Sequence, residues 1–193
     1  PEEARKFLEP IYQSNSSDPE TAGILGGIYK ELFKKNQDSK LAILSRDTYA
    51  KNFEATKSYY TGINAASMSA VGMQASKSKI LAKEVIALID EATEDFWELA
   101  TLAEALLLTK EKDKSVQVYT RAKKAAGSDW GKITSVHNQL WLLNNFIPVP
   151  ADVQKMFSPP GVMAFTGHMI DSPGTARVRF PAEIEGEVKK AID

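Results

Sequence analysis

Residues 18–55 read DPETAGILGGIYKELFKKNQDSKLAILSRDTYAKNFEA, and this stretch decides the fold. Asp18 and Pro19 predict a helix start, because Asp caps free N–H groups and Pro fits the first helical turn. Apolar residues then recur at spacings of three and four on either side of the polar break at 36–39, which is typical of two amphipathic helices. Helices joined by so short a connection pack antiparallel, so we predict a helical hairpin here.

The hairpin carries small and aromatic residues at fixed places. On the first helix these are Leu25, Gly26 and Tyr29, and on the second they are Ser45, Tyr49 and Asn52. The spacing resembles the tetratricopeptide pattern, Trp-x2-Leu-Gly-x2-Tyr followed by small, aromatic and small positions, with Ala22 in place of the Trp. A Gly at this place lets the two helices approach closely, and the aromatic ring fills the space beside it.

Weaker copies of the pattern follow through residue 146. The leading positions 22, 60, 97 and 130 differ by 38, 37 and 33, and the second-helix positions 45, 82 and 115 differ by 37 and 33. The two series keep step near the tetratricopeptide period of about 34 residues. We therefore predict an all-α fold, a right-handed α-solenoid of tetratricopeptide-like hairpins over residues 1–146. An ordinary helical bundle with accidental spacing is the alternative.

The apolar spacings also predict the other helices of the array. A helix at 2–14 is expected to be the second half of a repeat whose first half lies upstream, and Pro10 either bends it or divides it. Further helices are expected at 56–71, 76–92, 94–108, 115–126 and from 129 to about 145. Gly72 and Gly127 stand where glycine commonly ends a helix.

The character of the chain changes after residue 146. Prolines bracket residues 147–161, which we interpret as a linker or as a capping helix near 151–157. An apolar run at 162–166 reads as a buried strand, and Pro181 starts a helix through about residue 192. A strand, a loop and a helix are the opening of a βαβ unit. We therefore expect residues 162–193 to be the truncated start of an α/β domain.

Composition and charge exclude several classes of partner. Lys plus Arg number 24 and Asp plus Glu number 25, which gives a net charge of −1 and nothing to attract nucleic acid or an anionic membrane. No apolar run approaches the roughly 20 residues that a membrane helix needs. Cysteine is absent, and no signal peptide is visible, so we expect a cytoplasmic protein.

No motif for catalysis, a metal or a cofactor is found in the chain, so we expect a fragment that is not an enzyme. His137 falls at a packing position of its repeat and is interpreted as a core residue. The loop with Gly167, His168 and Asp171 follows the predicted strand, where α/β folds place ligand-contacting residues. It is either a phosphate- or nucleotide-contacting loop or a structural turn, because its glycines match neither G-x-G-x-x-G nor a P-loop.

The first helices of tetratricopeptide arrays line a groove, and the repeat alignment predicts which side chains face it. The expected partner-binding groove comprises Lys30, Glu31, Thr61, Met68, Ser69, Glu98, Asn138 and Gln139. This set is polar and mixed in charge, and it lacks the Lys-rich cluster that clamps a C-terminal carboxylate. We expect a protein or peptide partner there, the alternative being that the protein's own segments fill the groove.

Two segments carry a resemblance to a known family. Residues 20–33, ETAGILGGIYKELF, and residues 60–66, YTGINAA, resemble the tetratricopeptide-containing central regulatory region of the apoptosis signal-regulating kinases, also called the TRAFs-binding domain. The likeness covers roughly residues 4–143, and bacterial proteins carry a similar region without the kinase. The segment FTGHMID at 165–171 resembles the start of a Rossmann-like domain found beside it in bacterial relatives. No kinase segment is present, so kinase activity is not implied.

Together these observations predict a protein–protein interaction scaffold, or the regulatory region of a larger signalling protein. The resemblance implies a helical scaffold that gathers signalling partners in a bacterial-type protein. The alternative is the regulatory helical part of a nucleotide- or ligand-sensing or processing protein, whose α/β domain begins near Val162. The sequence does not determine the oligomeric state.

Overall fold

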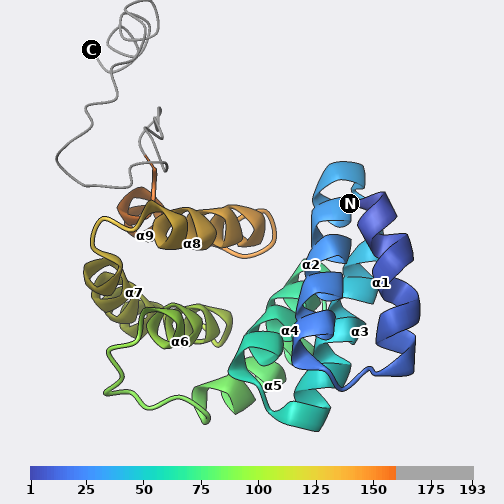
Figure 1. The fold of residues 1–193 in the computed structure, drawn as a ribbon. Helices are drawn as coiled ribbons and strands as arrows, with labels where there is room; N and C mark the ends of the chain where they lie inside the picture. The colour runs from blue at the N-terminus through green and yellow to red at the C-terminus, as the bar shows by residue number, and fades with distance from the viewer. Residues whose placement is uncertain (160–193) are drawn as a thin grey trace, which may run out of the picture. The chain divides into compact units, whose positions relative to one another are not determined.

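The structure, a computed structural model, describes residues 1–159. This part of the chain is helical and without strands, which confirms the predicted all-α class there (Figure 1). The helices are α1 (Glu2–Ser14), α2 (Pro19–Asn36), α3 (Ser39–Thr56), α4 (Tyr59–Val71), α5 (Ala75–Ile86), α6 (Phe96–Leu108), α7 (Lys112–Ala126), α8 (Trp130–Leu143) and α9 (Ala151–Met156).

The chain divides into two compact units, Pro1–Ser158 and Pro159–Asp193. Three of the sequence predictions fall in the second unit, outside the described residues. These are the strand at 162–166, the helix that starts at Pro181, and the loop with Gly167, His168 and Asp171. They stay predictions, and so does the incomplete α/β domain.

Within the first unit the helices pack as successive hairpins. α2 packs on α3, α4 on α5 and α6 on α7, and α3 also packs on α4, so neighbouring hairpins lie side by side (Figure 1). The second-helix positions Ser45, Ala82 and Ser115 are all fully buried. Ser45 Oγ donates a hydrogen bond to the carbonyl of Gly26, and Ser115 Oγ to that of Ala103, each at 2.8 Å. Paired helices therefore recur, while the right-handed sense of the solenoid stays a prediction.

Two glycines on first helices set the spacing inside the hairpins. A Cβ atom at Gly26 would lie 2.7 Å from the ring of Tyr49. A Cβ atom at Gly62 would lie 2.7 Å from both Phe53 and Val85. Both distances are shorter than van der Waals contact, so only a residue without a side chain allows α2 to approach α3 and α4 to approach its neighbours this closely.

The structure corrects the end of one predicted helix. α5 stops at Ile86, six residues before the predicted end at 92. The N–H groups of Leu88 and Ile89 bond to carbonyls three residues back, which tightens the last turn. The carboxylate of Asp90 then accepts from the N–H of Ala92 at 2.9 Å. This turn competes with the helix, because Asp favours such local bonds.

Pro10 and Gly72 show how the predicted helix breakers act. α1 runs through Pro10 as one helix, so Pro10 does not divide it. α1 buries none of its residues, and a surface helix tolerates the missing bond more easily than a packed one. Gly72 does follow the last residue of α4, but with a φ of −77°. The left-handed residue is the next one, Met73, with a φ of 57°.

The short helix α9 packs on α7 and α8. Val153 and Phe157 are fully buried there, and the ring of Phe157 lies 5.7 Å from that of Tyr119 in an edge-to-face arrangement. Such a ring pair adds to the free energy gained from burial. The interpretation of residues 147–161 as a linker or as a capping element stays a prediction.

The apolar core falls into two clusters. The larger cluster extends from α3 to Phe157, and the smaller one joins α2, α3 and α4. Leu142 of α8 belongs to the smaller cluster, and the rings of Phe33 and Phe146 lie 6.3 Å apart. The last long helix therefore contacts the first full hairpin directly, although about three hairpins of sequence separate them.

Candidate functional site

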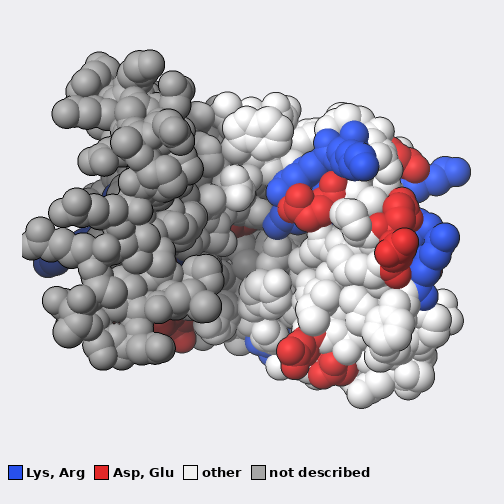
Figure 2. Space-filling view, turned by 45° about the horizontal axis from the view of Figure 1, so that its top comes forward, with Lys and Arg blue, Asp and Glu red and all other residues white. Residues whose placement is uncertain are grey.

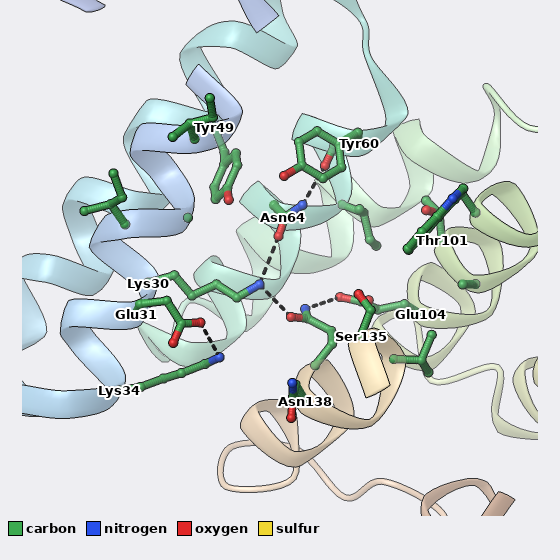
Figure 3. A pocket seen from close by; sticks show the side chains of 18 of the residues that line it. Lys30, Glu31, Lys34, Tyr49, Tyr60, Asn64, Thr101, Glu104, Ser135 and Asn138 are labelled. Atoms are coloured by element: carbon green, nitrogen blue, oxygen red, sulfur yellow. Dashed lines mark hydrogen bonds and ion pairs between the residues drawn. The ribbon is translucent and has the colours of Figure 1, made fainter. Parts of the chain in front are cut away.

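A cavity of about 560 Å³ opens between α2, α4, α6 and α8, and we call it the central pocket (Figure 3). Its polar and aromatic lining includes Lys30, Glu31, Tyr60, Asn64, Trp97, Thr101, Glu104, Ser135, Asn138 and Gln139. These residues lie within helices rather than loops, so helix packing holds their positions. The pocket is large enough for a few side chains of a peptide or for a small molecule.

A chain of hydrogen bonds crosses the central pocket and links its four helices (Figure 3). Lys30 Nζ donates to Oδ1 of Asn64 at 3.1 Å and to Oε1 of Gln139 at 2.6 Å. Gln139 Nε2 in turn donates to Oε1 of Glu104 at 2.6 Å, and Ser67 Oγ donates to the same oxygen. The amide of Gln139 therefore bridges a lysine and a glutamate. We call these five residues the polar network.

Burial perturbs the lysine of the network most clearly. The pKa of Lys30 falls from 10.5 to about 8, mainly because the ammonium group loses water, and the nearby Lys34 charge acts in the same direction. The negative charges of Glu104 and Glu31 act in the opposite direction. An ammonium group has three N–H donors. Two of them are used by Asn64 and Gln139, which leaves one for a ligand.

The glutamate of the network is almost completely buried. Glu104 is 8% exposed, and this burial raises the pKa of its carboxyl group. Hydrogen bonds from Ser67 and Gln139, and the charge of Lys30, oppose the rise. Burial also raises the pKa of the neighbouring Tyr119, and the charge of Glu104 adds to the effect. A carboxyl group in this setting needs its hydrogen-bond partners, because a buried charge without them is costly.

Aromatic rings form the side walls of the central pocket. Tyr60 is 50% exposed and Trp97 is 47% exposed, so each presents a free face. The ring of Tyr49 meets that of Tyr60 edge to face, with 6.3 Å between their centroids. Exposed aromatic rings next to amide and hydroxyl groups are the mixture that recognition surfaces use.

The structure brings together four of the eight residues predicted for the groove. Lys30, Glu31, Asn138 and Gln139 line the central pocket from α2 and α8. Lys30 and Gln139 are bonded to each other, and Glu31 accepts from Lys34 at 2.6 Å.

The other four predicted residues lie elsewhere. Thr61, Met68 and Ser69 are buried, with exposures of 0%, 1% and 0%. Glu98 does not line the pocket, and its carboxylate accepts from Thr93 Oγ1 at 2.5 Å. The difference comes from the rotation of α4 and α6 about their axes. On these two helices the pocket is faced by residues 60, 63 and 64 and by residues 97, 100, 101 and 104.

Three residues of the polar network were not predicted from the sequence to belong to a functional site. Asn64, Ser67 and Glu104 stand at first-helix positions that the repeat alignment assigns to helix packing. The available signal was their polarity, since a carboxylate within the apolar run LAEALLL needs hydrogen-bond partners in a packed helix. Such buried polar residues are stabilised only when they hydrogen-bond to one another in a network.

Within residues 1–159, histidine and the acidic side chains form no metal centre. His137 of α8 is half-buried, and no group of three His, Asp or Glu side chains within residues 1–159 is arranged to hold a metal. In the view of Figure 2, basic and acidic side chains lie beside one another on the surface that is not drawn in grey. Lys34 pairs with Glu31 at 2.6 Å, and Arg5 with Glu2 at 3.1 Å. None of the described helices is long and apolar enough to span a membrane.

Comparison with known proteins supports the repeat. A family model described as "TPR-S: Tetratricopeptide Repeats-Sensor" matches residues 1–69, which cover α1, the hairpin of α2 and α3, and most of α4. This part of the chain is therefore tetratricopeptide-like. No protein among the curated sequences matches the chain. Tetratricopeptide-type repeats generally mediate protein–protein interaction or regulation, and such helical folds are typically non-catalytic.

Proposed function

We propose that this chain is a non-enzymatic interaction module that binds a segment of a partner protein in the central pocket. One observation carries the proposal: α2, α4, α6 and α8 turn polar groups and half-exposed aromatic rings toward a single cavity. Arrays of helical hairpins build binding surfaces in this way, because the first helix of each hairpin faces the same side.

The pocket offers groups that a peptide can bind. Thr101, Ser135 and Asn138 line it, and their side chains make no hydrogen bond to another residue within 1–159. Hydroxyl and amide groups both donate and accept, so they suit the N–H and C=O groups of a peptide backbone. Tyr60 and Trp97 provide flat apolar surface for a side chain of the same peptide.

The wider setting follows from the sequence resemblance. The module is a regulatory region of a larger cytoplasmic signalling protein, similar to the central regulatory region of the apoptosis signal-regulating kinases and carried in a bacterial-type protein without the kinase. The motifs at residues 20–33 and 60–66 support this assignment. The tetratricopeptide-like match over residues 1–69 covers both motifs. A right-handed array would place the first helices on its inner side.

Selection from a random peptide library tests the proposal. Peptides that bind the chain are expected to lose affinity by about tenfold or more for Ser135→Trp, because the indole fills the pocket without replacing a member of the polar network. Lys124→Trp on α7, where the lysine is exposed outside the pocket, is the matched control. Peptides that bind the wild type and both variants equally would place their binding elsewhere.

A second candidate is a ligand-sensing role for the same pocket, with the helices regulating an α/β domain that begins near Val162. The word "Sensor" in the description of the matching family favours it, as does a cavity of about 560 Å³ that contains a lysine with a lowered pKa. A nucleotide panel in a thermal unfolding assay tests this role. A ligand that raises the midpoint for wild type and not for Lys30→Met supports it, and no response to any nucleotide removes that class.

A further inference from the structure

A second cavity, of about 740 Å³, lies where the turns of two neighbouring hairpins meet the end of α8. Its walls come from the α4–α5 turn, the α6–α7 turn and residues 146–148. We call it the edge pocket. It shares no lining residue with the central pocket, so the two surfaces can be altered separately.

The floor of the edge pocket is apolar. Leu108, Phe146 and Ile147 line it, and Phe146 keeps 38% of its surface exposed. A large side chain placed against these three residues would remove apolar surface from water on both partners.

The rim of the edge pocket is positively charged. Lys79, Lys110 and Lys112 line it, and no Asp or Glu is among its lining residues. None of the three lysines forms an ion pair with a carboxylate of the described residues. Two carboxylates flank Lys112 in sequence: Glu111 is engaged by Lys114 at 2.9 Å, and Asp113 lies in the first turn of α7. The rim therefore has basic groups available for an anion.

Two helix starts add to this positive character, and a buried hydroxyl supplies a hydrogen-bond donor. α5 and α7 both begin at the edge pocket, and neither has a side chain that caps its first turn. Their free N–H groups carry partial positive charge. Ser78 lines the same pocket, is 2% exposed, and has an Oγ without a hydrogen-bond partner within residues 1–159. An unpartnered buried hydroxyl is unfavourable, so a ligand acceptor would satisfy it.

We propose that the edge pocket binds an acidic segment of a partner protein, which places one large apolar side chain against Leu108, Phe146 and Ile147 and its carboxylates at the lysine rim. Lys79 lies in α5, whereas Lys110 and Lys112 lie at the turn between α6 and α7 and at the start of α7. A single anionic headgroup would meet one part of the rim, whereas carboxylates spaced along a peptide reach both parts. The surface is a second interaction site that does not depend on what the central pocket binds.

Fluorescence anisotropy with a defined probe tests the proposal on the full chain. The probe is a fluorescein-labelled peptide, Glu-Asp-Glu-Leu-Phe-Glu-Asp-Glu. The variant with Lys79, Lys110 and Lys112 all changed to Gln is expected to bind it at least about tenfold more weakly. A matched variant with Lys6, Lys35 and Lys124 changed to Gln alters the net charge equally at exposed sites and is expected to change affinity by less than about threefold.

Two further arms separate the parts of the site. Ser78→Ala, which leaves the charge unchanged, is expected to weaken probe binding by roughly three- to tenfold while the fold is kept, because it removes a donor to a carboxylate. A probe with Gly-Gly in place of Leu-Phe is expected to bind about tenfold more weakly. Equal loss in the two lysine variants, no binding of the probe, or binding of palmitate in its place would each overturn the proposal.

Discussion

A single missing side chain sets the distance between α2 and α3. The ring of Tyr49 lies against the backbone of Gly26, where a Cβ atom would be 2.7 Å from the ring carbon. Tyr49 is 1% exposed, so the ring cannot turn out into water without leaving a void. The neighbouring Gly27 is different, because a Cβ atom there would meet only the hydroxyl of Tyr49, at 3.6 Å.

We therefore expect opposite effects at the two positions. Gly26→Ala should lower the free energy of unfolding by about 1–3 kcal/mol, since the methyl group forces the helices apart. Gly27→Ala should raise it by up to about 1 kcal/mol, because alanine is the better helix former and the space is open. Urea denaturation followed by circular dichroism measures both. Equal effects of the two substitutions would contradict the packing argument.

Lys30 should make stability depend on pH in a defined window. Burial lowers its pKa to about 8 in the folded protein from 10.5 when unfolded. Between these values the unfolded chain binds more protons, so the free energy of unfolding rises with pH. We expect a rise of about 1–2 kcal/mol from pH 7.5 to 9.5, measured by urea denaturation.

The rise should disappear in Lys30→Met, which has no proton to release. Lys35→Met, which removes an exposed lysine of the same helix, should keep it. Glu104 contributes in the opposite sense and at lower pH, because burial raises its pKa and the folded state then holds the extra proton. A wild-type protein whose stability stays flat over this window would show that Lys30 is more hydrated than its contacts indicate.

At the scale of the helices, periodicity predicted the elements better than their orientation. The hairpin at 18–55 appears as α2 and α3 with Asp18 as the N-cap, because capping and apolar spacing are local properties. The facing residues of α2 and α8 were also predicted. Those of α4 and α6 were not, since both helices are buried on nearly every side. The spacing of apolar residues does not show which side of a helix faces a groove when the helix has no distinct polar side.

The polar network escaped prediction for a related reason. Lys30 and Gln139 are 109 residues apart, and their hydrogen bond depends on how far the array turns between α2 and α8. That turn is a sum of small rotations at each hairpin, which no single motif specifies. Lys30 and Gln139 were predicted from the sequence as groove residues, but their hydrogen bond to each other was not.

The turn between α4 and α5 contains a strained residue that is open to improvement. Met73 has a φ of 57° and is 88% exposed, so its side chain contributes little burial. A left-handed conformation costs a residue with a Cβ atom about 1–2 kcal/mol. Met73→Gly should raise the free energy of unfolding by roughly 0.5 kcal/mol, after the greater freedom of glycine in the unfolded chain is subtracted.

A neighbouring position provides the control for this prediction. Gln74 has an ordinary φ of −100°, so Gln74→Gly gains no relief of strain and should lower stability by about 0.5–1 kcal/mol. Thermal unfolding of both variants distinguishes the two effects. Destabilisation by Met73→Gly as large as that of Gln74→Gly would mean that the turn is not strained.

At the scale of the whole described unit, α8 ties the end of the helical array to its beginning. Repeat arrays normally hold together through neighbouring contacts alone, and their stability is close to a sum over repeats. Here Gln139 bridges Lys30 of α2 and Glu104 of α6, and Leu142 packs into the cluster of α2 and α4. These contacts between distant hairpins should make residues 1–158 unfold as one cooperative unit.

Gln139→Leu tests that coupling. The substitution removes both hydrogen bonds of the bridge and leaves Lys30 and Glu104 without a common partner, so we expect a loss of about 2–3 kcal/mol. The signal from tryptophan fluorescence reports on α6 and α8, which carry Trp97, Trp130 and Trp141. Circular dichroism reports on every helix. In wild type the urea transitions measured by fluorescence and by circular dichroism should coincide, and in the variant fluorescence should change at lower urea.

Asn138→Leu, at an exposed neighbouring position, is the control and should leave the two transitions coincident. Coincident transitions in Gln139→Leu would mean that apolar contacts at Leu142 and Phe146 suffice to hold α8 against α2.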